Sequence, residues 1–570
     1  MDFTPATADQ LLALKVCAGI DELAKHPRFE AATPDLVEAL VEGNGQFAAG
    51  EFAPLNRKGD LEGAKLANGT VSLPDGFREA YQAFVEQGWN STSADPEYGG
   101  QGLPFSLAAN VLENLGSANM AFSLLPMLTV GAIEALGHYG SAAQKDLFLP
   151  KLISGEWSGT MNLTEPQAGS DVGALRSTAT PITGGEHAGK YAIKGTKIFI
   201  TWGEHDLAAN IVHLVLARTP GAPAGTRGIS LFLVPKFHVD AEGRIGARND
   251  LRCAGIEHKL GIMASPTCVM SFGDNDECIG ELIGRENEGL KAMFAMMNSA
   301  RINVGGQGVE IAERAWQQAR GYARERAQGA RGGAPVAIAE HPDVRRMLLR
   351  MRALTEGSRA LLYYTAGQID RGSLGDAAAQ ARADVLVPLL KAWGTDVGCE
   401  VASLGVQIHG GMGFVEETGA AQHYRDARIA PIYEGTNGIQ AADLVTRKLG
   451  YENGVVVTSL LSDVARECAG TPLATLAQEC VAVAEWMRDH ASIDDRLAGS
   501  VPFLTMCAVA VAGWQLQRQV PAAEGALAKT KPVVARWFAH DFAEETRGLK
   551  AAATAGAALL YELDAEALTA

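Results

Sequence analysis

One glutamate, Glu434, stands in a segment that could carry out proton transfer. It follows an apolar and aromatic run from Ile429 to Tyr433 and precedes Gly435. A carboxylate in apolar surroundings has a pKa raised toward neutrality, which is what a general base needs. A surface glutamate at the start of a helix has the same sequence, so the segment alone leaves both interpretations open.

A second segment of chemical interest runs from Met161 to Asp171 and reads MNLTEPQAGSD. It is rich in hydroxyls and small residues, and it lies where a helical region gives way to strands. Such a junction exposes backbone N–H groups and lets a planar ring approach the main chain closely. An ordinary turn between domains explains the same residues equally well.

A third segment, QIHGGMGF from Gln407 to Phe414, is rich in glycine. Glycines let a phosphate approach the backbone, but a helix C-cap or a close contact between helices needs them too. The glycines follow a helical region and no strand, which argues against a Rossmann dinucleotide site. The sequence has no P-loop, no H-E-x-x-H and no G-x-S-x-G motif.

Charge and cysteine content argue against several classes of function. The 570 residues carry a formal net charge of -17, which disfavours binding to nucleic acid or to an anionic membrane. None of the eight cysteines forms a C-x-x-C pair, so neither a disulfide framework nor a zinc site is expected, and no metal is predicted. The first 25 residues resemble neither a secretory signal nor a transit peptide, so we expect a cytoplasmic protein.

The elements that position these segments change in type along the chain. The sequence predicts helices up to about Gly159, with breaks at Pro96–Pro104 and near Pro150. Short β-branched runs then predict a small antiparallel sheet. Helices are expected again from about Gly289, and an Ala-rich helical extension after Gly450. The expected strands are 191–193 and 198–201 around a turn at 194–196, then 211–217, 229–234 and 268–272. Two uncharged stretches, one between Glu113 and Glu134 and one between Arg496 and Arg518, are interpreted as buried core helices.

Together the three segments resemble the acyl-CoA dehydrogenase family, from about Pro34 to Lys448. Matches at Pro96–Pro104 (PEYGGQGLP), Lys197–Thr201 (KIFIT) and Lys259–Gly261 (KLG) support the resemblance. The length and the C-terminal extension are similar to the larger members, and most of all to bacterial enzymes of the methylmercaptopropionyl-CoA dehydrogenase type.

The resemblance implies a mainly α fold with a small central antiparallel β domain, in which FAD and substrate meet between the domains. It implies four parts: an N-terminal helical domain (1–159), a β domain (160–280), a helical bundle with the catalytic glutamate (281–449) and a helical extension (450–570). It also implies FAD as cofactor, an acyl-CoA substrate, an electron-transfer flavoprotein as electron acceptor and a homodimer that shares FAD between subunits.

The resemblance assigns roles to individual residues. Glu434 matches the catalytic base. Some members place this carboxylate just before the arginine that contacts CoA, but that position is Ala300 here. The family commonly has Phe-Gly after the arginine that matches Arg326, and this chain lacks the Phe. The residues implied to contact FAD are Met161, Leu163, Thr164, Phe199, Thr201 and Thr436, with Arg326, Gln407, Gly410 and Gly411 reaching the FAD of a neighbouring subunit. The residues implied to bind substrate are Ser170, Asn298, Arg301, Tyr433 and Gly435.

The family mechanism implies that Glu434 removes the α-proton while a hydride leaves Cβ for flavin N5, which yields a trans-2-enoyl-CoA. Hydrogen bonds to the thioester carbonyl, one of them from the Glu434 N–H, stabilise the enolate-like charge. Two alternatives remain: an acyl-CoA oxidase or flavin monooxygenase on the same fold, and a non-catalytic or DNA-associated relative. The net charge of -17 and the intact Glu434 argue against the latter.

Overall fold

The computed structural model describes residues 3–570, except for the side chain of residue 295. Contacts divide the chain into two units. Unit 1 comprises Met1–Gln46, Pro104–Ser117 and Arg301–Ala570, and unit 2 comprises Phe47–Leu103 and Ala118–Ala300. The four-domain division predicted from the sequence stays a prediction.

Unit 2 is built around an eight-stranded sheet with the order β10-β11-β5-β12-β7-β6-β3, in which β4 pairs with β5. The expected strands at 211–217, 229–234 and 268–272 are confirmed as β6, β7 and β11. The sheet is not wholly antiparallel, because β3 and β6 run parallel. The strand bounds are β3 Trp157–Asn162, β4 Thr178–Pro181, β5 Tyr191–Thr201, β6 Asn210–Ala217, β7 Ser230–Pro235, β10 Leu251–Ile256, β11 Thr267–Phe272 and β12 Ile279–Ile283. Two small hairpins, β1 Lys65–Ala67 with β2 Thr70–Ser72 and β8 Phe237–Val239 with β9 Ile245–Arg248, were not predicted.

The predicted turn at 194–196 is wrong, because β5 runs unbroken from Tyr191 to Thr201. Gly195 is needed for close packing and not for reversing the chain. A Cβ at this position would lie 2.2 Å from Oγ of Ser177 and 3.0 Å from its Cα, and φ is +153°. The glycine therefore lets two segments of the sheet region come together.

The predicted helix break near Pro150 is also wrong. Pro150 lies inside α7 (Ala142–Ser154), which begins at a capping box of Ser141 and Gln144 and ends at Gly155 with φ +82°. A proline inside a helix removes one backbone hydrogen bond. The two caps and the buried face that includes Leu149 and Leu152 stabilise the helix despite that loss. The break predicted at Pro96–Pro104 is confirmed, since it holds only one short turn of helix, Pro96–Tyr98.

Unit 1 is a helical assembly around two long helices, α9 (Pro342–Ser373) and α10 (Ala377–His409), which pack against each other. The helix predicted from Gly289 is confirmed as α8 (Gly289–Glu325), followed by the hairpin β13 (Ala327–Arg331) and β14 (Ala334–Ala337). The other helices of this part are α1 Thr7–Ala13, α2 Ile20–Leu23, α3 Pro34–Phe47, α11 Ala420–Ala427 and α12 Asn437–Thr446.

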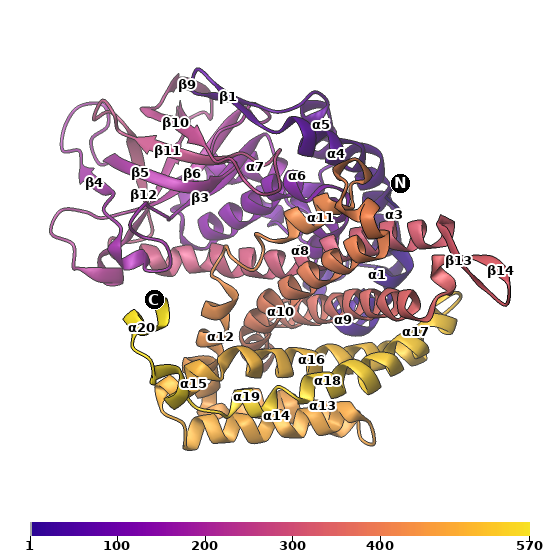
Figure 1. Ribbon diagram of the computed structural model, residues 1–570. Helices are drawn as coiled ribbons and strands as arrows, with labels where there is room; N and C mark the ends of the chain where they lie inside the picture. The colour runs from indigo at the N-terminus through magenta and orange to yellow at the C-terminus, as the bar shows by residue number, and fades with distance from the viewer. Residues whose placement is uncertain (1–2) are drawn as a thin grey trace. The chain divides into compact units, whose positions relative to one another are not determined.

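The predicted extension after Gly450 is helical, and α16 packs against both α9 and α10 (Figure 1). Its helices are α13 Val455–Glu467, α14 Pro472–Asp489, α15 Ile493–Ala498, α16 Ser500–Gln519, α17 Leu527–Trp537, α18 Ala543–Arg547, α19 Lys550–Ala553 and α20 Ala565–Thr569.

A buried network of charges joins this extension to the rest of unit 1. Lys531 of α17 bonds Asp9 of α1 and lies 2.8 Å from Glu356 of α9. Arg359 lies 2.6 Å from Asp9, 2.7 Å from Glu113 and 2.8 Å from Glu313. Removing one member would leave an unpaired buried charge, so these groups fix how the helices pack.

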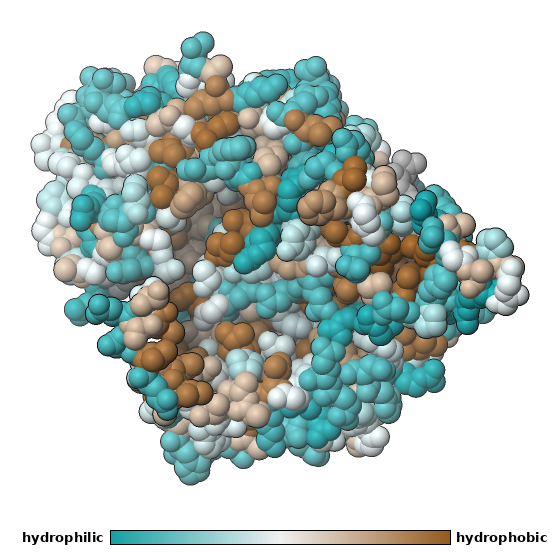
Figure 2. Space-filling view, in the orientation of Figure 1, coloured by the Kyte–Doolittle hydropathy of each residue, from teal (hydrophilic) through white to brown (hydrophobic). Residues whose placement is uncertain are grey.

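The two uncharged stretches are confirmed as mostly buried helices. The first lies in α6 (Phe105–Tyr139), whose length and hydropathy would allow it to cross a membrane, although 83% of its most apolar window is buried. The second forms most of α16, where Phe503 and Trp514 are among the buried residues. Apolar side chains also lie on the surface of the extension, at Ile493, Leu497 and Val501. Figure 2 shows brown side chains over α15 and the nearby C-terminal segment.

Candidate active site

Glu434 lies in a tight loop between α11 and α12 in unit 1. The loop is closed by backbone bonds from Tyr433 N–H to the Ile429 carbonyl (3.2 Å) and from Asn437 N–H to the Pro431 carbonyl (3.0 Å). Glu434 has φ +55° and Gly435 has φ +85°. A left-handed conformation is unfavourable for a glutamate, and such strain in a defined loop is characteristic of functional positions.

The carboxyl group of Glu434 is half-buried and its acidity is shifted. Burial raises the pKa of Glu434 to about 7, against the opposing effect of the positive charges of Arg301 and Lys391. These cations donate to other groups: Arg301 Nε to the Glu434 backbone carbonyl at 3.4 Å, and Lys391 Nζ to Asn437 Oδ1 at 3.0 Å. The carboxyl group thus titrates near neutral pH, as a general base does. The alternative of an ordinary surface glutamate does not fit this environment.

Polar contacts of Asn437 hold the loop against α10. Asn437 Nδ2 donates to the Ala392 carbonyl at 3.0 Å and to Asp396 Oδ1 at 2.8 Å. Lys391, whose side chain is buried, donates to the same asparagine, and burial lowers the pKa of Lys391 to about 8. The first turn of α12 and the base before it are therefore fixed to a rigid helix, which a catalytic group requires. Sequence reasoning had missed both Lys391 and Asn437.

The neighbours of Glu434 have distinct roles. The Tyr433 hydroxyl donates to Gln307 of α8, and burial raises the pKa of Tyr433. Thr436 is the N-cap of α12, where its Oγ1 accepts from Ile439 N–H at 3.2 Å. A Cβ on Gly435 would lie 2.7 Å from Gln440 Nε2, so glycine is required there by space as well as by φ. The predicted residues Arg301, Tyr433, Glu434, Gly435 and Thr436 thus lie together.

In unit 2, the second segment is built around a buried ion pair that sequence reasoning had missed. Glu165 accepts from Lys197 Nζ at 2.8 Å, from Ser177 Oγ at 2.6 Å and from Arg176 N–H at 2.7 Å. Burial by itself raises the pKa of Glu165, but the Lys197 charge and these hydrogen bonds lower it to about 2. Burial lowers the pKa of Lys197 to about 8, so both groups are charged at neutral pH.

The ion pair ties the second segment to strand β5. Lys197 Nζ also donates to the Leu163 carbonyl at 3.1 Å, and Ile198 N–H donates to the Thr164 carbonyl at 2.9 Å. The predicted residues Met161, Leu163 and Thr164 are half-buried beside this strand. Their backbone is therefore fixed by Glu165 and Lys197, which are positioning residues.

A β-bulge exposes Phe199 on the same strand. The register between β11 and β5 shifts between Cys268 and Met270, opposite Ile198 and Phe199. Phe199 has φ +59° and its side chain is 58% exposed. Bulges re-aim side chains out of a sheet. The result is an exposed aromatic ring near half-buried Thr201. Of the other predicted residues, Ser170 and Asn298 are exposed in unit 2.

A separate group of predicted residues lies at the far ends of α8 and α10 in unit 1. The rings of Tyr322 and His409 stack at 4.4 Å, which brings these two helix ends together. Arg326, Gln407, Gly410 and Gly411 are all exposed there. Gln407 is 16 residues after Lys391 on α10, which is about 24 Å along the helix. This group and the Glu434 loop are therefore distinct in unit 1.

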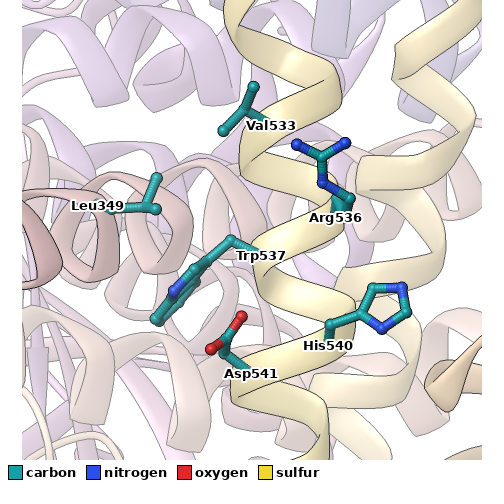
Figure 3. A pocket seen from close by; sticks show the side chains of 6 residues that line it. All are labelled: Leu349, Val533, Arg536, Trp537, His540 and Asp541. Carbon is teal, nitrogen blue, oxygen red and sulfur yellow. The ribbon is translucent and has the colours of Figure 1, made fainter.

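A pocket of about 320 Å³ lies elsewhere, between α9 and the helical segment that begins with α17 (Figure 3). Its lining residues are Leu349, Val533, Arg536, Trp537, His540 and Asp541. None of the residues that line this pocket is a predicted site residue, and Glu434 is not among them. The positions of Glu434 and Phe199 are therefore the better guide to function.

Comparison with known proteins decides the family. Models of the N-terminal, middle and C-terminal domains of acyl-CoA dehydrogenases match residues 37–156, 160–275 and 287–449. A fourth model, described as acetyl-CoA dehydrogenase C-terminal like, matches residues 457–564. The chain belongs to the acyl-CoA dehydrogenase family. Its resemblance to the larger members is confirmed by the match to the C-terminal extension.

Individual relatives of this acyl-CoA dehydrogenase agree with the family assignment. The 3-methylmercaptopropionyl-CoA dehydrogenase of Ruegeria pomeroyi is 51% identical over 538 residues, which cover 90% of each chain. A broad-specificity linear acyl-CoA dehydrogenase of Mycobacterium tuberculosis is 33% identical over 94% of each chain. An acyl-CoA dehydrogenase of Bacillus anthracis, solved with FAD, shares the fold with a TM-score of 0.75, 21% identity and coverage of 95% of this chain and 91% of that chain.

The family is FAD-dependent, and the residues of unit 2 fit this cofactor. A flavin has a planar ring with apolar faces and polar edges. The exposed Phe199 ring and the aliphatic side chains of Met161 and Leu163 suit the faces. The hydroxyls of Thr164 and Thr201 and the local backbone N–H groups suit the edges. The mainly α fold with a central sheet, the enzyme class and the cofactor predicted from the sequence are thus confirmed.

Proposed function

We propose that this enzyme oxidises the Cα–Cβ bond of an acyl-CoA thioester to a trans-2-enoyl-CoA, with Glu434 as the base that removes the α-proton. The single observation that carries the proposal is the environment of Glu434. A half-buried carboxyl with a pKa of about 7 lies in a strained loop, and its neighbouring cations donate to other atoms.

The residues around Glu434 account for the proton transfer. Above pH 7 the carboxylate is ionised and can accept a proton, and the charges of Arg301 and Lys391 keep its pKa from rising further. The α-proton of a thioester is weakly acidic, so the enolate-like oxygen needs a hydrogen-bond donor. We assign the Glu434 N–H to this role. Bound FAD supplies the acceptor for the hydride that leaves Cβ.

The 51% identity to the Ruegeria pomeroyi enzyme supports a substrate proposal. We propose 3-methylmercaptopropionyl-CoA or a similar short acyl-CoA as the substrate. Ser170, Asn298 and Arg301 are proposed to contact the CoA portion, and an electron-transfer flavoprotein is proposed to receive the electrons. A cytoplasmic location remains part of this proposal.

We also propose a homodimer in which Arg326, Gln407, Gly410 and Gly411 reach the FAD of the second subunit. All four are exposed, and nearby Phe414 is 88% exposed. A large exposed aromatic side chain near exposed polar residues and glycines is typical of an interaction surface. The missing Phe after Arg326 means that the contact made by the β13–β14 hairpin differs from the usual one.

The test is an anaerobic visible spectrum of the FAD-loaded enzyme during addition of acyl-CoAs. We expect 3-methylmercaptopropionyl-CoA and short saturated acyl-CoAs to bleach the oxidised flavin. Glu434→Gln should keep its FAD and lose about 10²–10⁴-fold in the rate of bleaching, which is the usual contribution of a general base. Glu417→Gln, at an exposed position in the same unit, is the matched control and should bleach like the wild type.

Other outcomes would contradict specific parts of the proposal. A yellow enzyme that no acyl-CoA bleaches would contradict the substrate class. Equal bleaching by wild type and Glu434→Gln would exclude Glu434 as the base. Fast reaction of the substrate-reduced flavin with oxygen would indicate the acyl-CoA oxidase or monooxygenase alternative.

A further inference from the structure

Glu310 on α8 is a buried acid that the proposed mechanism does not use. Its side chain is 3% exposed, and its carboxyl fills the space beside Gly116, where an added Cβ would lie 1.7 Å from Oε2. Among the described residues, Oε2 has no hydrogen-bond partner. Burial and the negative charge of Glu113 raise the pKa of Glu310 well above its usual range.

The neighbouring acids show that Glu310 is exceptional in this region. Glu113 and Glu313 are equally buried, but Arg359 contacts them at 2.7 and 2.8 Å. Glu113 also accepts from the Tyr363 hydroxyl at 2.7 Å. The local cation is thus committed to other carboxylates. A buried polar atom without a partner is costly, and a ligand that supplies the partner is one physical explanation for keeping it.

Two residues, Gln307 and Tyr433, connect Glu310 to the proposed base. Tyr433, directly before Glu434, donates its hydroxyl to Gln307, and Gln307 is three residues before Glu310 on the same face of α8. Burial is the main cause of the raised pKa of Tyr433, and an ionised carboxylate at Glu310 would raise that pKa further, so the two groups are close enough to interact. Glu310 therefore lies close to Tyr433, which directly precedes the proposed base Glu434.

A second unpartnered group lies on the same helix face. Asn303 is four residues before Gln307 and is 4% exposed. Its Nδ2, like Oε2 of Glu310, has no partner among the described residues. Asn303, Gln307 and Glu310 form a buried polar stripe that passes the Tyr433 hydroxyl. A site for a purely hydrocarbon chain would be lined by apolar side chains at such positions.

We propose that this polar stripe, with Glu310 as its main determinant, lines the acyl site and selects acyl groups that carry an oxygen or sulfur acceptor over hydrocarbon chains of equal length. The proposal rests on the proposed acyl-CoA oxidation and names the class of acyl group for that site. Un-ionised Glu310 offers an O–H donor and Asn303 offers an N–H donor, so a thioether or ether atom gains a partner that a methylene cannot use.

The test compares two substrates of equal length, 3-methylmercaptopropionyl-CoA and pentanoyl-CoA. The ratio of their kcat/KM values is measured in the wild type, Glu310→Leu and Glu310→Gln. The sulfur atom on Cβ alters intrinsic reactivity in every variant alike, so the change in ratio isolates recognition. We expect the ratio to fall about fivefold in Glu310→Leu, the size of one neutral hydrogen bond, and to stay within about twofold in Glu310→Gln, which keeps a donor.

Controls separate recognition from folding. Glu325→Leu, at an exposed position on the same helix, should leave the ratio unchanged. If Glu310→Leu fails to fold, Asn303→Leu carries the test and should lower the ratio in the same direction. An unchanged ratio in the folded apolar variants would overturn the proposal while leaving the dehydrogenase intact. Failure of both substrates to bleach the wild-type flavin would instead contradict the proposed function.

Discussion

Glu165 in unit 2 and Glu434 in unit 1 lie in the two most distinctive segments of the chain, yet their environments are opposite. Glu165 accepts from a lysine at 2.8 Å, a serine hydroxyl and backbone N–H groups, and its pKa is about 2. Glu434 has cations nearby that donate to other atoms, and its pKa is about 7. A carboxylate that is fully satisfied is fixed in its ionised form and holds structure. One that is left without partners can accept a proton.

The difference also appears in the backbone. Glu434 has φ +55°, a strained value for this residue, whereas Glu165 is absent from the residues with positive φ. Backbone strain and the burial of the carboxylate both cost stability at Glu434, and the clamp made by Asn437 and Lys391 offsets part of that cost. Glu165 stabilises the surface on which a flavin can rest, and Glu434 is the proposed reactive group.

The largest expected effect that tests this comparison is on stability. Glu165→Gln leaves Lys197 buried without its counter-charge, and we expect a loss of about 3–5 kcal/mol in the free energy of unfolding. The double variant Glu165→Gln/Lys197→Met should be more stable than Glu165→Gln, because no unpaired charge remains. Urea unfolding of the full-length variants, followed by circular dichroism, measures the stability of the single and the double variant. The FAD content of each variant is measured alongside.

Glu434→Gln provides the matched contrast at pH 8. The folded-state pKa of Glu434, about 7, is raised above its unfolded value, so ionising it costs stability as the pH rises from the unfolded pKa to about 7. Replacing the Glu434 carboxylate with the neutral amide should leave the free energy of unfolding at pH 8 unchanged or increase it. If Glu165→Gln and Glu434→Gln were equally destabilised at pH 8, the division into a structural and a reactive carboxylate would be wrong.

The sequence is informative where the signal is local. The start of α8 at Gly289, the strands β6, β7 and β11, and the buried nature of α6 and α16 follow from patterns within a few residues. The prediction that Glu434 has a raised pKa also depends on its immediate apolar neighbours, and the structure agrees with it.

The remainder depends on partners distant in the chain. Glu165 and Lys197 are 32 residues apart, and their pairing appears only once β5 lies beside the second segment. Gly195 looks like a turn residue, but its requirement comes from the approach of Ser177. The parallel pairing of β3 with β6 likewise has no local signal. The lack of a partner for Glu310 Oε2 among the described residues depends on which carboxylates Arg359 contacts.

The next effect in size is the pH dependence of the reductive half-reaction. If Glu434 is the base, as proposed, its carboxylate must be ionised, so the rate should rise through pH 7 and be about tenfold slower at pH 6 than at pH 8. Glu165 has a pKa of about 2 and does not titrate in this range. Stopped-flow measurement of flavin bleaching from pH 5.5 to 8.5 gives the profile. A flat profile over this range would contradict a base with a near-neutral pKa.

The smallest expected effect is a shift of that profile in Lys391→Met. Lys391 lowers the pKa of Glu434 through its charge, since its Nζ donates to Asn437 and not to the carboxylate. Its loss should move the acidic limb upward by about 0.5–1 pH unit, a modest value for a charge without a direct hydrogen bond. Lys529→Met, at an exposed position on α17, should leave the limb in place. If the acidic limb of the pH profile stays near pH 7 in Lys391→Met, the charge of Lys391 does not set the acidity of Glu434. Lys391 would then serve only to hold Asn437, as Lys197 serves to hold Glu165.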